Sequence, residues 1–307
     1  MKINSQKSSK QTHKYIKHIE LAPYNPDWPK LYESEAARIK QALGDNYIAI
    51  HHVGSTSVPS LIAKPKIDII AVVVDLQRSI KTLEQIGAEY RGEYNIPGRY
   101  FFRKRGGIDV NLHGDIDVNL HIYEKDHPEI ELNLMFRDYL RTHPAARDQY
   151  ALLKQKLLQD KSSFEKNHRT FTEYTMRKGD FIREILKDAG FSSVRIIRCS
   201  DQTEWSAAKK LRKQYFTNIK SNDPNDLESC YLNAQNAPSA PAARRAFMDE
   251  DEHLALYKGP EIIGYSHIHL PGNNKPVIRI LIIDENHHGQ GFEEKFLTLI
   301  REFIIAS

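Results

Sequence analysis

Apolar side chains recur near helical spacing in several stretches of this chain. Between residues 28 and 43 they would line one face of a helix, and Gly44 follows directly, which predicts that the helix ends there. The same period predicts further helices over residues 79–86, 133–158, 164–189, 201–216 and 291–305. The two longest of these runs would form a helical cap on the first half of the chain.

Apolar, β-branched runs predict strands between the helices. The run over residues 67–74 is apolar except for Asp68, a pattern typical of a strand that is buried on both faces. A Gly-Pro turn at residues 259–260 predicts a hairpin. The further predicted strands cover residues 100–103, 194–197, 253–257, 262–268 and 277–283.

One hexapeptide occurs twice. Ile-Asp-Val-Asn-Leu-His fills residues 108–113 and recurs, shifted by eight, over residues 116–121. Because side chains along a strand alternate with a period of two, an even shift lets either copy enter the same strand with the same residues on the same face. We predict that the second copy is the strand and the first an extended hairpin arm. The alternative is a longer ordinary hairpin without functional meaning.

Length and composition predict two globular domains. The chain has 307 residues, and a typical domain has about 150. We predict a disordered tail over residues 1–18, a first domain over residues 19–190 and a second over residues 194–307. Although the tail holds several lysines, the net charge of the chain is only +4, which gives no strong signal for nucleic-acid binding.

Cysteine content and hydropathy predict a cytoplasmic protein. Two cysteines are too few for a disulfide framework. No stretch approaches the roughly 20 apolar residues of a membrane span, so we expect no membrane partner. The composition does not indicate an oligomeric state.

The most informative stretch combines a glycine, hydroxyl side chains and two lysines. Its members are Gly54, Ser55, Thr56, Ser57, Lys64 and Lys66. A glycine lets the backbone approach a ligand closely, hydroxyl groups bond to phosphate oxygens, and ammonium groups balance the charge. We predict that this stretch binds a phosphate group and faces a common pocket with Asp68.

Asp68 is the candidate metal ligand and a candidate catalytic residue. A lone carboxylate in a buried strand needs a metal ion or a cation as partner. Two Mg²⁺ ions would need two or three carboxylates, yet the next position on the same strand face is Ile70. A distant carboxylate such as Asp117 or Glu124 could complete one site.

The order Gly-Ser, a spacer and then a strand with Asp resembles the nucleotidyltransferase fold, and more narrowly the GrpB family. The resemblance covers about residues 19–190. It is supported further by the sequence motifs at 23–29, 99–103, 119–124 and 136–144. It implies an α+β fold with a mixed sheet and a helical cap. It also implies binding of a nucleotide or another phosphorylated small molecule, with Mg²⁺ at Asp68 and nucleotidyl transfer left open.

Further candidates in this half are polar residues beside predicted strands. His121 could act as an acid or base, because imidazole titrates near neutral pH. Arg103 stands beside an aromatic run, where it could contact a phosphate or a base; the alternative is a strand whose arginines face water. His52 is a candidate for the same roles, and the alternative for each histidine is an ordinary polar or partly buried side chain. The charged residues over 137–143 could face the cleft but are typical of a solvated helix face.

In the second half a hairpin, a strand, a loop with Gly289, Gln290 and Gly291, and a helix follow one another. This order resembles the GNAT acetyltransferase family, in which this loop holds the pyrophosphate of acetyl-CoA. His288 and Glu293 depart from the family pattern, and a carboxylate at that point would repel a pyrophosphate. The chain also ends before the strands that would close the cleft. The resemblance therefore implies a partial α/β domain with weak or absent acetyl-CoA binding.

Three functions remain open from the sequence. The first is binding of a nucleotide or phosphorylated small molecule by the first domain. The second is acetyl-CoA-dependent N-acetyl transfer by the second domain. The third is a non-catalytic binding module that uses both.

Overall fold

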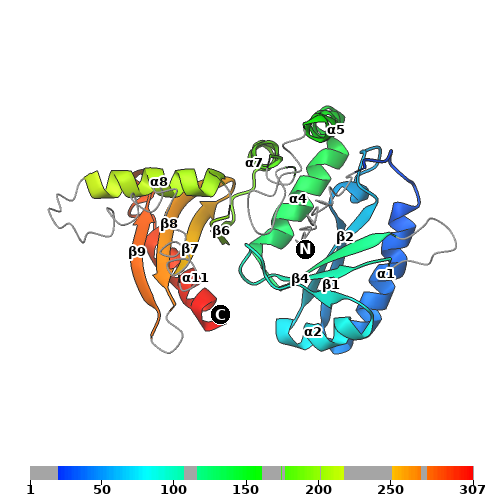
Figure 1. Cartoon of the computed structure of the whole chain (residues 1–307), viewed down its shortest axis with the longest axis horizontal. Coiled ribbons are helices and arrows are strands. Elements are labelled where there is room, and N and C mark those ends of the chain that lie inside the picture. Colours follow the sequence, from blue (N-terminus) through cyan, green and yellow to red (C-terminus); the bar gives the residue numbers. More distant parts are fainter. Residues whose placement is uncertain are drawn as a thin grey trace, which may run out of the picture.

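Two separate β-sheets organise the molecule (Figure 1). The computed structural model describes residues 20–106, 116–160, 174, 177–200, 202–217, 251–270 and 275–306. The predicted tail over residues 1–18 and the first part of the predicted helix over 164–189 lie outside the described residues. No helix among those described is long and apolar enough to cross a membrane.

The first sheet has five strands in the order β1-β2-β5-β4-β3. Its strands are β1 (Tyr47–Val53), β2 (Lys66–Val73), β3 (Glu89–Tyr90), β4 (Tyr100–Lys104) and β5 (Asp117–Glu124). β2 and β5 pair in parallel, whereas the other neighbours are antiparallel. The fold is therefore a mixed sheet with helices, as the sequence predicts.

Helices α1 (Trp28–Leu43) and α2 (Leu76–Gln85) cover one face of the first sheet. Gly44 ends α1 with a positive φ of 55°, as expected for a helix stop. The Asp75 carboxylate accepts hydrogen bonds from the first turn of α2 and so begins it. The core between them takes every second residue of β2 and β5, including Ile67, Ile69, Val118 and Leu120.

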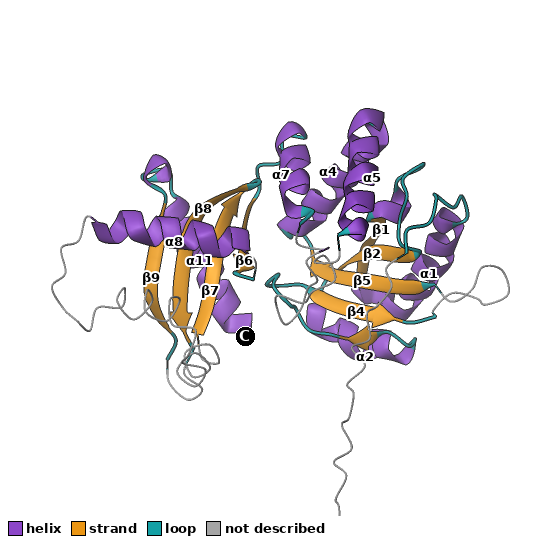
Figure 2. Ribbon diagram, turned by 45° about the horizontal axis from the view of Figure 1, so that its top comes forward, coloured by secondary structure: helices purple, strands orange, loops and turns teal. Residues whose placement is uncertain are grey.

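The opposite face of the first sheet carries polar residues under a helical layer. Alternation along β2 and β5 places Asp68, Asn119 and His121 on this face. Helices α4 (Pro128–Thr142) and α5 (Pro144–Gln159) and the later α7 (Gly179–Asp188) lie on this side (Figure 2). The helical cap predicted over residues 133–158 consists of two helices, because Pro144 restricts His143 and one helix ends where the next begins.

The second copy of the hexapeptide forms the strand, as predicted. Of its residues, 117–121 begin β5 and pair with β2, and 118–121 also pair with β4. The first copy, over 108–113, lies outside the described residues.

The second sheet has four antiparallel strands in the order β6-β7-β8-β9. Its strands are β6 (Val194–Arg198), β7 (Asp251–Lys258), β8 (Glu261–His269) and β9 (Val277–Ile283). Helix α8 (Gln202–Thr217) covers one face and α11 (Phe292–Ala306) the other (Figure 2). The predicted hairpin is β7 and β8, and Gly259 turns between them.

Strand β6 joins the second sheet to the first part of the chain. The Arg195 Nε atom donates to the Glu129 carboxylate of α4 over 2.9 Å, and both side chains are buried. The Arg198 backbone N–H donates to the Asn95 carbonyl, and its guanidinium donates to Glu93 over 2.8 Å. These contacts fix the second sheet against the 93–95 loop and the start of α4.

Candidate functional site

The predicted phosphate-binding loop follows β1 as a single 3-10 turn, Ser55–Ser57. Gly54 precedes the turn with φ 69° and ψ −173°, a conformation that is open almost only to glycine. A Cβ atom at this position would lie 2.5 Å from the Asp68 Oδ2 atom. Gly54 therefore brings the loop backbone against the Asp68 carboxylate.

We expect Gly54→Ala to lower the free energy of unfolding by about 2–3 kcal/mol, since strained backbone and a displaced carboxylate add up. Gly44→Ala is the matched control, because Gly44 also has a positive φ, but a Cβ atom added there would meet no atom within 4 Å. Denaturant unfolding of both variants measures the difference. Equal losses would show that contact with Asp68 contributes nothing.

Two of the three loop hydroxyl groups hold the loop itself together. Thr56 donates to the Lys66 carbonyl over 3.1 Å and lies 3.1 Å from the His52 Nε2 atom. Ser57 donates to the Gly54 carbonyl over 2.6 Å. Burial, followed by nearby arginines, lowers the pKa of His52 to about 4, so its imidazole is neutral. The Ser55 hydroxyl instead accepts a hydrogen bond from a helix that lies far along the chain, through Lys154.

Asp68 lies beside the loop in a polar row across three strands. Its Oδ1 atom accepts a hydrogen bond from the Asn119 amide over 2.7 Å. Arg103 pairs with Asn119 from the other side, on β4. The Arg103 Nε and Asn119 Oδ1 atoms are buried without a hydrogen-bond partner among the described residues, so this row retains polar atoms that a ligand could satisfy.

Two lysines from distant parts of the helical layer complete the site. The Lys154 ammonium of α5 donates to the Ser55 hydroxyl over 3.1 Å and to the Ile62 carbonyl. Lys154 is only 2% exposed. Burial, followed by the charges of Lys178 and Lys64, lowers its pKa to about 7. Burial also lowers the pKa of Lys178 to about 8, while Asp68 opposes that change.

The Tyr174 ring links two of these lysines. The Lys64 ammonium lies 4.1 Å and the Lys178 ammonium 4.8 Å from the ring centroid, within cation–π distance. Burial raises the pKa of Asp68, whereas Asn119 and the lysines lower it. We call Lys64, Lys154 and Lys178, with Ser55 and Asp68, the lysine site.

The other predicted residues lie at its edges. Lys66 pairs with Asp117 on the neighbouring strand, with 3.5 Å between the charged atoms. His121 lies on the same sheet face, two residues beyond Asn119, between Ile70 and Phe101 of the adjacent strands. Burial, followed by Arg99, lowers the pKa of His121 to about 3, so the group is a weak base near neutral pH.

The donor set does not fit a pair of Mg²⁺ ions. Ile70 shares the strand face with Asp68, and the Asp117 carboxylate is held by Lys66. Glu124 accepts a hydrogen bond from the start of α2, at the far end of β5. Within the described residues, no group of three His, Cys, Asp or Glu side chains could hold a metal ion. Lysines rather than carboxylates surround Asp68.

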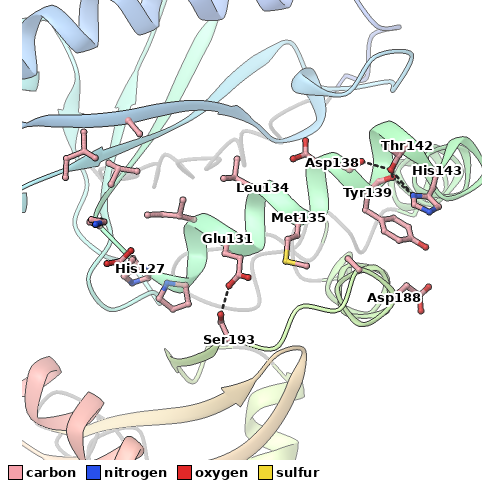
Figure 3. A pocket seen from close by; sticks show the side chains of 18 residues that line it. His127, Glu131, Leu134, Met135, Asp138, Tyr139, Thr142, His143, Asp188 and Ser193 are labelled. Carbon is pink, nitrogen blue, oxygen red and sulfur yellow. Dashed lines mark hydrogen bonds between the residues drawn. The ribbon is translucent and has the colours of Figure 1, made fainter.

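A groove of about 970 Å³ runs along α4, away from the predicted loop (Figure 3). Leu134 and Met135 of α4 line it, and Ser193 hydrogen-bonds to Glu131 at its side. Its described lining includes Asp126, Glu131, Asp138 and Asp188, whereas Lys125 is its one lysine or arginine. This charge disfavours a phosphate, and none of the predicted phosphate-binding residues lines the groove.

The predicted acetyl-CoA loop connects β9 to α11. Gly289 and Gly291 have positive φ values of 71° and 81°. The Gln290 amide donates to the Asn286 carbonyl, so this side chain stabilises the loop. Glu293 and Glu294 occupy the first turn of α11, where their carboxylates favour the helix dipole but oppose an anionic ligand. Acetyl-CoA binding stays a prediction.

A partly buried histidine cluster on the second sheet was not anticipated from the sequence. The Asp251 Oδ1 atom lies 2.8 Å from His269 Nδ1 and 3.3 Å from His267 Nε2. The His253 ring stacks on His267 with 4.6 Å between centroids. Burial lowers the pKa of His253 to about 3 and of His267 to about 4. Alternate histidines on paired strands, at 253 and at 267 and 269, are the signal that could have found it.

Comparison with known proteins covers the part of the chain that holds the lysine site. A family model described as GrpB protein matches residues 18–188. The UPF0157 protein BH1888 of Halalkalibacterium halodurans is 39% identical over 174 residues, which are 56% of this chain and 82% of that protein. The UPF0157 protein YqkA of Bacillus subtilis is 40% identical over 149 residues, 47% of this chain and 41% of its own length.

A solved structure is also similar to this chain. The conserved protein GrpB from Enterococcus faecalis has 34% sequence identity to it, with a TM-score of 0.46. The match covers 55% of this chain and 96% of that one.

Proposed function

The chain belongs to the GrpB family, and from that premise we propose that it binds a phosphorylated small molecule, such as a nucleotide, at the lysine site. The observation that supports this most is the gathering of three lysine ammonium groups around Ser55 and Asp68. Ammonium groups that lie close together and partly out of water repel one another unless an anion lies between them. A phosphate group is such an anion.

The charges of the site match those of a phosphate. The lysine site holds three lysines and one carboxylate, Asp68, which leaves an excess of two positive charges when all four groups are ionised. A phosphate monoester carries about that charge at neutral pH. The Ser55 hydroxyl, next to Lys154, adds a hydrogen-bond partner for a phosphate oxygen.

We propose binding rather than nucleotidyl transfer as the activity of this site. Transfer by the two-metal route needs carboxylates that hold both ions, and the sheet face offers Asp68 with Ile70 beside it. Neutral His121 between apolar neighbours does not supply a second catalytic base near neutral pH. Acetyl-CoA binding by the second half is the alternative that the same measurement tests.

Thermal unfolding with and without ligands tests the proposal. We expect AMP and the nucleoside triphosphates ATP, GTP, CTP and UTP to raise the unfolding temperature. A ligand at 100 times its Kd adds about 2.7 kcal/mol to the native state. Adenosine, which lacks the phosphate, is the matched control and should have little effect. Thermal unfolding with acetyl-CoA is measured under the same conditions.

Two results would contradict the proposal. If adenosine stabilises the protein as much as AMP does, recognition does not involve the phosphate. A shift with acetyl-CoA alone would move the function to the second half of the chain.

A further inference from the structure

We infer that the lysine site holds its phosphate without a divalent cation, with the Lys154 and Lys178 ammonium groups in the role that metal ions play in two-metal transfer. The inference rests on the proposed function and concerns how the same site balances charge. It specifies the ligand as a dianionic phosphate group that is bound free of metal.

The positions of the ammonium groups carry the argument. Lys154 is buried and fixed by hydrogen bonds to Ser55 and to the Ile62 carbonyl, so its charge stands at a defined place beside the loop. Lys178 immediately precedes α7 and lies against the Tyr174 ring. Both charges come from the helical layer that covers the sheet, on the side where Asp68 lies.

A cation at Asp68 would meet like charges. The ammonium groups of Lys66, Lys178 and Lys64 lower the pKa of the Asp68 carboxylate, so a divalent cation at this acid would add to positive charge that already surrounds it. Asn119 occupies its Oδ1 atom as a hydrogen-bond donor. Mg²⁺ prefers several oxygen ligands in octahedral geometry. The described groups around Asp68 are mainly ammonium groups and the Asn119 amide, which do not provide such a set.

Asp68→Asn separates the two ways of balancing charge, because they predict opposite signs. Without a metal, Asp68 repels the bound anion, so its neutralisation should strengthen phosphate binding about two- to tenfold. With a metal held by Asp68, the same change should weaken or abolish binding. Asparagine keeps the Oδ1 atom that accepts from Asn119, and circular dichroism checks that the variant is folded.

The measurement is calorimetry of the full chain with inorganic phosphate, in EDTA and in excess Mg²⁺. We expect affinities within about threefold of each other, tighter binding by Asp68→Asn, and at least tenfold weaker binding by Lys178→Met. Binding that requires Mg²⁺, or that Asp68→Asn abolishes in a folded protein, overturns the inference and leaves the proposed function standing. Absence of binding under both conditions contradicts the proposed function itself.

Discussion

Replacement of Lys154 by methionine is expected to abolish most phosphate binding and at the same time to stabilise the ligand-free protein. The lost hydrogen bond to a charged phosphate corresponds to about 1.5–3 kcal/mol, or roughly 10- to 100-fold in affinity. The lowered pKa of Lys154, about 7 instead of 10.5, means that burial, followed by the charges of Lys178 and Lys64, destabilises its charged form by about 5 kcal/mol. Unpaired acceptors at Ser55 and Ile62 offset about 1–3 kcal/mol, so a net gain of about 2–4 kcal/mol remains.

The pH dependence of stability provides a second measurement for this variant. Because folding lowers the pKa of Lys154, the unfolded chain binds more protons than the native chain between about pH 7 and pH 10.5. The free energy of unfolding of the unmodified protein therefore rises with pH across that window. Lys154→Met should remove the part of this rise that Lys154 contributes.

Lys156→Met is the matched control, because Lys156 is exposed on the same helix. It should alter neither phosphate affinity nor stability by more than about 0.5 kcal/mol. Calorimetry gives the affinity, and denaturant unfolding at several pH values gives the stability. If Lys154→Met loses stability and keeps its affinity, Lys154 is a structural lysine and the site is elsewhere.

Replacement of Glu129 by alanine is expected to lower the free energy of unfolding by about 3–5 kcal/mol, because it leaves a buried cation unpaired. Its partner Arg195 is 8% exposed and also donates to the Gly259 carbonyl. In the variant, the Arg195 guanidinium retains two contacts: the Gly259 carbonyl and the Tyr257 ring. The centroid of that ring lies 4.3 Å from the Arg195 Cζ atom. Denaturant unfolding followed by circular dichroism measures the loss.

An exposed ion pair serves as the control for Glu129→Ala. Arg78 and Asp45 form an ion pair with 49% and 84% of their side chains exposed. Breaking it with Arg78→Ala should cost less than about 1 kcal/mol. Similar losses for the two variants would mean that the buried pair adds nothing beyond an ordinary surface contact.

Local patterns predicted many of the elements because local interactions decide them. The helix over residues 28–43 and the strand over residues 277–283 have the predicted bounds, since periodicity and a following glycine or loop specify both. Strand β1 was missed. Its paired histidines at 51 and 52 interrupt the apolar alternation, and pairing with β2 determines its strand structure.

The candidate site was only half predictable. Gly54, Ser55 and Asp68 lie within one turn-and-strand unit, so their proximity follows from the sequence. Lys154 and Lys178 stand far along the chain, and only the folded cap brings them to Ser55 and Asp68. A signal for Lys154 exists nevertheless: it takes an apolar position in the buried stripe of α5, between Tyr150 and Leu157.

The ion pair between α4 and β6 constrains how the two sheets can change over evolution. A substitution at Glu129 or Arg195 alone leaves a buried charge without its partner and destabilises the fold. Joint replacement of both by apolar residues changes the free energy of unfolding little. Positions 129 and 195 should therefore covary in chains that carry both sheets, whereas position 129 should vary freely in chains that carry the first sheet alone. Such a difference would show that the two parts of the chain depend on each other through this pair.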